Sequence, residues 1–298
     1  MNIFRFRDRL GILDERSRHF LKTVAWLGGY ATPEQAQELK IRDSTTRVHV
    51  QLKDLESWRF IKPIATYPAV YQVTKSVTRL LGADLAARRQ HTLETIRTRL
   101  LTVNFYLEAI RWPAEFVFDH QQKVSKLCQL VGEPFLLPHR GSRPYLWQDI
   151  VLQRPSGEVV LTMVDHFGWH PYRQLYRHLK RFAPTLGPHD LRLMIVVSSE
   201  RREQLFRRQL NYTRLQRLLE DQGVYLPLRD MVTIYRVRSA VPVIRPVITN
   251  RQQLRELRAR KLANQGLSDT QQQTGHVIHN NGTHANTAIS NEEGGTSW

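Results

Sequence analysis

Residues 41–60 read IRDSTTRVHVQLKDLESWRF, and this stretch decides how the first part of the chain is expected to fold. Three apolar residues recur in it at helical spacing: Val48, Leu52 and Leu55. The spacing predicts a helix with one buried face, capped by Asp43 or Ser44 and ending near Trp58. Small polar groups and cations lie on the other side of its first turns, which is typical either of a helix that reads DNA or of an ordinary capped surface helix.

The segments on either side favour the first interpretation. A helix is expected within residues 12–30, ending at two glycines, and a shorter one opens at Thr32-Pro33 and runs to about Leu39. After the third helix, residues 60–65 and 69–73 predict two short strands. Three helices followed by a hairpin is the order of a winged helix-turn-helix. We therefore predict such a domain over residues 10–80, with a capped helix in a helical bundle as the alternative.

The charge balance of the chain points to an anionic partner. Among 298 residues, Lys and Arg number 44 and Asp and Glu number 27, a formal net charge of +17. Nucleic acid is the first partner expected for such a chain, and an anionic membrane surface the second. The single cysteine, Cys128, rules out a disulfide or a cysteine zinc site within one chain. No run of 18 apolar residues occurs, so we expect no membrane partner and a cytoplasmic location.

A connecting helix is predicted over residues 83–111. It carries apolar residues on one face: Leu93, Ile96, Leu100, Val103 and Leu107. Such a helix would either join two domains or pair with its counterpart in a homodimer.

Residues 112–240 predict an α/β domain, because strands and helices alternate along them. Strands are expected at 115–119, 146–153, 158–167, 190–200 and 231–237, and helices at 122–130, 172–184 and 201–223. Leu193, Ile195 and Val197 would face one side of the fourth of these strands, and Met194 and Val196 the other, as in the middle of a sheet. Residues 241–298 are expected to form a basic segment and a disordered tail.

Three stretches together resemble the plasmid replication-relaxation family. They are RRQHTLETIRTRLL at 88–101, DIVL with GEVVLTMVD at 149–165, and YRQLYRHLKRF at 172–182. The resemblance covers roughly residues 10–220. It implies an α+β chain in which a winged helix precedes an α/β domain similar to the PD-(D/E)XK restriction-type nucleases, as in the relaxases of some mobilisable plasmids.

The same resemblance implies a magnesium site. Two carboxylates hold the ion in that nuclease fold, and here Asp149 and Asp165 stand at the corresponding places as candidate catalytic and metal-binding residues. Gln148 replaces the expected proline, Met163 replaces an acid, and no lysine follows at the family's spacing, with Lys180 on the next helix instead. These departures leave three interpretations open: the two acids are solvent-facing strand ends, or the domain is a degenerate nuclease fold that binds DNA or protein, or it is a working metal-dependent nuclease. A tyrosine can form a covalent link to a phosphodiester, and three tyrosines are candidates for that role, although nothing in their spacing favours it over packing: Tyr145, Tyr172 and Tyr176.

The leading functional hypothesis is a DNA-binding protein of a plasmid or other mobile element, acting in replication or conjugative transfer. Its partners would be double-stranded DNA and relaxase or replication proteins, and it would need no cofactor. The expected DNA contacts are Ser44, Thr45, Thr46, Arg47, His49, Lys53, Arg59 and Lys62. The alternatives are a Mg²⁺-dependent DNA nickase that uses Asp149 and Asp165, and a winged-helix transcriptional regulator.

Overall fold

The computed structural model describes most of the chain between residues 11 and 244. The described residues are 11–66, 68–75, 77, 91–133, 137, 139–140, 143–144, 150–165, 167, 175–176, 179–180, 191–210, 212–221, 223, 225 and 228–244. They belong to one compact unit. Asp149, Tyr145, Tyr172 and the predicted disordered tail lie outside the described residues.

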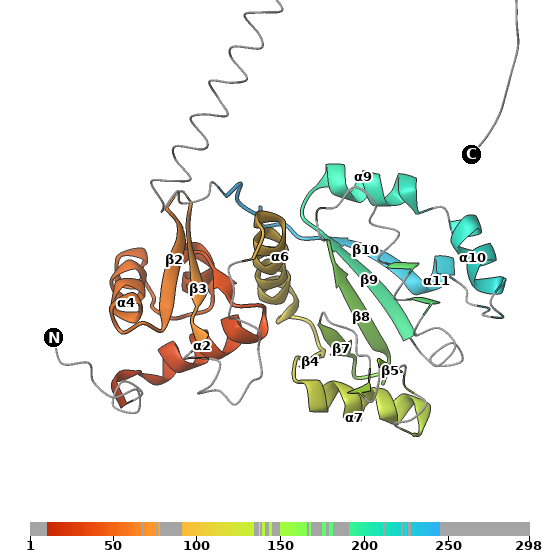
Figure 1. The fold of residues 1–298 in the computed structure, drawn as a ribbon, viewed down its shortest axis with the longest axis horizontal. Coiled ribbons are helices and arrows are strands. Elements are labelled where there is room, and N and C mark those ends of the chain that lie inside the picture. The colour runs from red at the N-terminus through yellow and green to blue at the C-terminus, as the bar shows by residue number, and fades with distance from the viewer. Residues whose placement is uncertain are drawn as a thin grey trace, which may run out of the picture. The chain divides into compact units, whose positions relative to one another are not determined.

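The N-terminal region, residues 11–77, contains three helices and a small antiparallel sheet (Figure 1). Its helices are α2 (Glu15–Trp26), α3 (Pro33–Glu38) and α4 (Thr45–Ser57), and its strands are β1 (Tyr30–Ala31), β2 (Ile61–Thr66) and β3 (Ala69–Val73). The strand order is β1-β3-β2. The three expected helices and the hairpin are therefore present, and the pairing of β1 with β3 adds a strand that the sequence pattern did not indicate.

Local sequence explains where these helices begin. Thr32 and Gln35 form a reciprocal capping box with Pro33 in the first turn of α3. Ser44 caps α4 by accepting a hydrogen bond from the backbone N–H of Arg47. Each cap satisfies donors that a helix start otherwise leaves unpaired, so both boundaries match the expectation.

A five-stranded mixed sheet follows, in the order β10-β9-β8-β7-β4. Its strands are β4 (Glu115–Val117), β7 (Val151–Gln153), β8 (Val159–Val164), β9 (Leu191–Val197) and β10 (Val232–Arg236). The last three run parallel to one another, and β7 is antiparallel to β4 and to β8. Short strands β5 (His139–Arg140) and β6 (Arg143–Pro144) form a separate pair. The chain is thus α+β overall.

The strand β9 is buried on both faces, as predicted. Met194 and Val196 pack into a core that continues to α2 and α4, whereas Leu193, Ile195 and Val197 pack into a second core with Phe206. The helices beside the sheet are α7 (His120–Val131), α9 (Glu200–Gln209), α10 (Tyr212–Glu220) and α11 (Leu228–Met231). The single helix expected over 201–223 is wrong, because the backbone leaves the helical region at Leu210, whose side chain turns into the second core.

The helix α6 (Leu93–Ala109) differs from the amphipathic connector that the sequence predicts. Leu93 is exposed, while from Leu100 to Tyr106 every side chain is buried, polar ones included. Gln35 donates hydrogen bonds to the Leu100 carbonyl and to Asn104, and the Thr98 hydroxyl donates to the Asp165 carbonyl. The helix is thus a central core element that contacts both the N-terminal region and the five-stranded sheet. None of the helices in the described part of the chain is both long and apolar enough to cross a bilayer.

Candidate nucleic-acid interface

Helix α4 has one buried and one exposed face. Val48, Gln51, Leu52 and Leu55 are buried. All eight residues predicted to contact DNA are exposed to solvent: Ser44, Thr45, Thr46, Arg47, His49, Lys53, Arg59 and Lys62. The first six lie at the N-cap and within the first three turns of α4. Arg59 follows the end of the helix, and Lys62 lies on β2.

Three cations on this surface, Arg47, Lys53 and Lys62, form no ion pair in the described part of the molecule. The first turn of α4 also lacks the acidic residue that α2 and α3 carry there. The positive end of the helix dipole is therefore uncompensated by an acid in its own first turn. Thr45 is the exception among the polar groups, since its hydroxyl donates to Gln37 on α3 at 3.0 Å.

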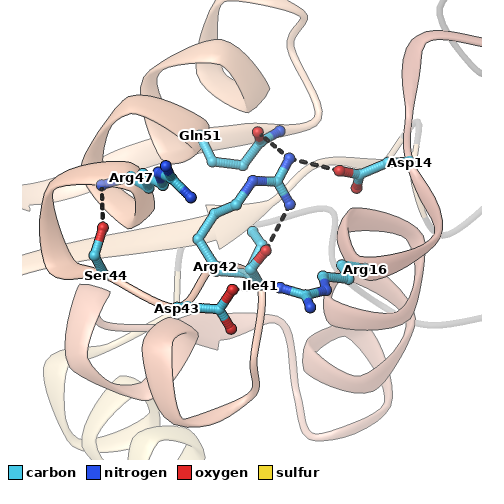
Figure 2. Close-up of polar contacts among 8 residues, drawn as sticks. All are labelled: Asp14, Arg16, Ile41, Arg42, Asp43, Ser44, Arg47 and Gln51. Atoms are coloured by element: carbon cyan, nitrogen blue, oxygen red, sulfur yellow. Dashed lines mark hydrogen bonds and ion pairs between the residues drawn. The ribbon is translucent and has the colours of Figure 1, made fainter.

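A polar network fixes the turn that leads into α4 (Figure 2). The guanidinium of Arg42 donates to the Ile41 carbonyl, to the Asp14 carboxylate at the start of α2 and to the Gln51 side chain on α4. Next to it, Arg16 pairs with Asp43 at 3.0 Å in a more exposed ion pair. Arg42 thereby ties the first and third helices together and sets the direction of α4.

The two carboxylates of this network have lowered pKa values. Partial burial acts to raise the pKa of Asp14, but hydrogen bonds from Ser17 and the Arg42 guanidinium outweigh it and lower the pKa. Its carboxylate both caps α2 through the Ser17 N–H and accepts from Arg42. The pKa of Asp43 is lowered mainly by its hydrogen bond from Arg16. Both groups therefore hold cations at neutral pH.

Two cations occupy backbone positions that usually belong to glycine. Lys40 after α3 and Arg59 after α4 have φ values of 62° and 60°. In each case the following amide bonds back into the last helical turn, as Phe60 N–H does to the Leu55 carbonyl at 2.9 Å. A side chain costs about 1 kcal/mol in this left-handed conformation. Arg59 therefore places a charge between α4 and the hairpin at some cost in stability.

Sequence reasoning missed one residue on this surface, Val50. Its side chain is 54% exposed in the middle of α4. An apolar residue at that position could have been recognised from the helical spacing, because Val48, Leu52 and Leu55 already define the buried face and Val50 does not belong to it.

The second candidate site has a different character. Asp165 follows β8 and is almost completely buried, and Arg202 from α9 donates to both of its carboxylate oxygens at 2.7 Å. The Phe167 N–H donates to the same carboxylate at 2.9 Å, and the Phe167 ring lies 4.2 Å from the Arg97 guanidinium. Three of the roughly four acceptor positions of the carboxylate are thus used within the protein. In the observed pairing the carboxylate joins β8 to α9.

Of the other residues proposed for chemistry, the structure describes Lys180 and Tyr176. Lys180 is exposed, and Tyr176 is half-buried against the second core. Within the described ranges, no three His, Cys, Asp or Glu side chains are grouped so that they could hold a metal ion.

Compared with known proteins, the chain matches no protein-family model, no curated protein and no solved structure.

Proposed function

We propose that this protein binds double-stranded DNA through a winged helix-turn-helix formed by residues 11–77. In this proposal α4 enters the major groove and the hairpin of β2 and β3 lies against the backbone as the wing. The observation that carries it is the exposed part of α4, where Arg47, His49 and Lys53 are all open to solvent and where, among the described residues, neither Arg47 nor Lys53 forms an ion pair.

The arrangement suits the two kinds of contact that specific DNA recognition needs. Base edges are read by side chains near the N-terminal turns of a recognition helix, where Arg47 and His49 lie. Phosphates are held by cations and small donors around it, for which Ser44, Lys53 and Lys62 are placed at the helix start, along the helix and on the wing. The +17 charge of the chain adds affinity through counterion release.

The biological setting we propose is replication or conjugative transfer of a plasmid or other mobile element, with relaxase or replication proteins as further partners. Its support is the resemblance of residues 10–220 to the replication-relaxation family. The nuclease-like domain would act there in binding, since Arg202 occupies the carboxylate of Asp165. Plasmid copy number and mobilisation frequency should fall when the gene is deleted; repression of its own promoter alone would instead favour a transcriptional regulator.

Binding of a random duplex over a salt series tests the proposal. Each phosphate contact adds about 0.9 to the slope of log K against log salt concentration, so affinity should fall steeply from low to physiological salt. Arg47→Ala should weaken binding and Lys62→Ala should lower the slope by about 1. Arg229→Ala serves as a matched control, because it removes another exposed cation, this one from α11. Equal losses for Arg47 and Arg229 would contradict a role for α4, and a flat salt response would contradict DNA binding.

A further inference from the structure

The exposed apolar side chain of Val50 stands out against the rest of the described surface. Six large apolar residues there are markedly exposed: Ile12, Val50, Leu93, Ile110, Tyr225 and Val243. Leu93 and Ile110 lie at the ends of α6, and Ile12 precedes α2, while Tyr225 and Val243 lie in loops. Within the described residues, Val50 is thus the one that occupies the interior of a helix.

Valine is a poor residue for that position on stability grounds alone. A β-branched side chain loses rotamer freedom in a helix, and an exposed one regains little of that loss by burial. Alanine or a long polar residue would favour the helix more. The presence of Val50 is therefore not explained by the stability of α4.

The neighbours of Val50 form a polar and cationic rim. Residues three and four positions away lie beside it on the helix surface, and these are Thr46, Arg47, Lys53 and Asp54. The first three are exposed and Asp54 is half-buried. Val50 is consequently a small apolar centre flanked by the two cations that are proposed to contact DNA.

The major groove offers one apolar group to such a centre, the 5-methyl group of thymine. Arginine and lysine on either side hold the helix to bases and phosphates, so an apolar side chain between them is pressed against the base edges. We infer that Val50 is a specificity-determining residue that contacts a thymine methyl group. This inference rests on the proposed DNA-binding function and adds to it a preference for thymine at one position of the site.

The test is a double-mutant cycle in which one change removes a thymine methyl group from the DNA and the other truncates the side chain of Val50. Duplexes that the parent protein selects from a random pool define its site, and each thymine in that site is then replaced in turn by deoxyuridine, which lacks only the methyl group. At one position this replacement should weaken binding by the parent protein about fourfold, the effect of burying one methyl-sized group. Val50→Ala should weaken binding of the thymine duplex by a similar factor and should no longer distinguish thymine from deoxyuridine there.

Two controls separate this role from others. Val50→Ala should have a Tm no lower than that of the parent, since alanine favours the helix, so lost discrimination cannot result from unfolding. Lys53→Ala should weaken binding to all duplexes alike and retain the difference between thymine and deoxyuridine.

The outcomes also separate the inference from the proposed function. Three results would show that Val50 does not read thymine although the protein binds DNA. The parent protein could bind duplexes without site preference, or no replacement of thymine by deoxyuridine could weaken its binding. The third is that Val50→Ala still distinguishes thymine from deoxyuridine. Loss of self-association in Val50→Ala with unchanged DNA binding would likewise assign Val50 to a protein contact and overturn the inference. If the parent protein binds no duplex at any salt concentration, both proposals fall.

Discussion

The surface of α4 and the buried end of β8 both carry charged residues that the sequence offers as functional candidates, and they use their charge in opposite ways. On α4, Arg47 and Lys53 are exposed and have no ion pair among the described residues. At the end of β8, Asp165 is buried and both of its oxygens are taken by Arg202. A charge without an internal partner is free to bind an external one, whereas a paired buried charge mainly holds elements together. This difference directs the functional proposal to α4.

The largest effect that follows concerns Asp165. Asp165→Ala should reduce the free energy of unfolding by about 3–5 kcal/mol, because it leaves the partly buried Arg202 guanidinium without its carboxylate. Chemical denaturation measures this. Arg207→Ala on the same helix removes a more exposed ion pair with Glu203 and should cost at most about 0.5 kcal/mol. A fully stable Asp165→Ala protein that had lost a Mg²⁺-dependent nicking activity would restore Asp165 as a catalytic residue.

Arg42→Ala should have an intermediate effect. It removes the guanidinium that links Asp14, Ile41 and Gln51, at a cost of about 1–2 kcal/mol in unfolding free energy. Arg42 positions α4 and is not among the proposed DNA contacts. The Arg42→Ala protein should therefore lose more affinity for the duplex selected from the random pool than for random duplexes. Arg16→Ala, which removes the exposed pair with Asp43, should change neither by much. Equal losses on selected and random duplexes would show that Arg42 touches DNA itself.

Arg59→Gly should raise stability and lower affinity together. Glycine relieves the positive φ of residue 59 and should add about 0.5–1 kcal/mol to the free energy of unfolding. The same change removes a proposed backbone contact and should weaken binding to all duplexes. Lys40→Gly relieves the same kind of conformation and provides the control for stability. If the Arg59→Gly protein is more stable but binds DNA as tightly as the parent, Arg59 does not contact DNA.

The smallest effect is a dependence of stability on pH through Asp14. Its pKa in the folded protein lies below the usual value of 3.8, so its contribution is present above that value and is lost as pH falls through the folded pKa. Asp14→Asn should therefore be less stable than the parent at pH 7. The difference in stability between the two proteins, called the gap below, should narrow as pH falls below about 4. Thermal unfolding at several pH values measures the gap. A gap that stays constant down to pH 2 would mean that the Asp14 charge does not contribute.

Local patterns predicted the N-terminal region well because its signals are local. Ser44 and Thr32 are capping residues close to the donors they satisfy, and Val48 and Leu52 mark a buried face by spacing alone. The two faces of β9 could be assigned for the same reason, since successive strand residues alternate.

Features that depend on distant partners could not be predicted. Arg202 lies 37 residues from Asp165, and their ion pair depends on how β8, β9 and α9 are arranged. The sequence predicts only one buried face for α6 because Thr98 and Thr102 are polar, yet both residues are buried. Their hydroxyls donate to carbonyls one turn earlier in the helix, which removes the cost of burying them.

Chemical cross-linking between α4 and DNA tests the central claim most directly. The chain has one native cysteine, so a Cys128→Ser background allows single thiols to be placed with His49→Cys on α4 and Arg229→Cys on α11. A duplex that carries a disulfide tether on its bases should trap the thiol at position 49, and an excess of unmodified duplex should compete the product away. Position 229 should give little product. Equal trapping at both positions, or trapping at position 229 alone, would contradict α4 as the DNA-binding surface.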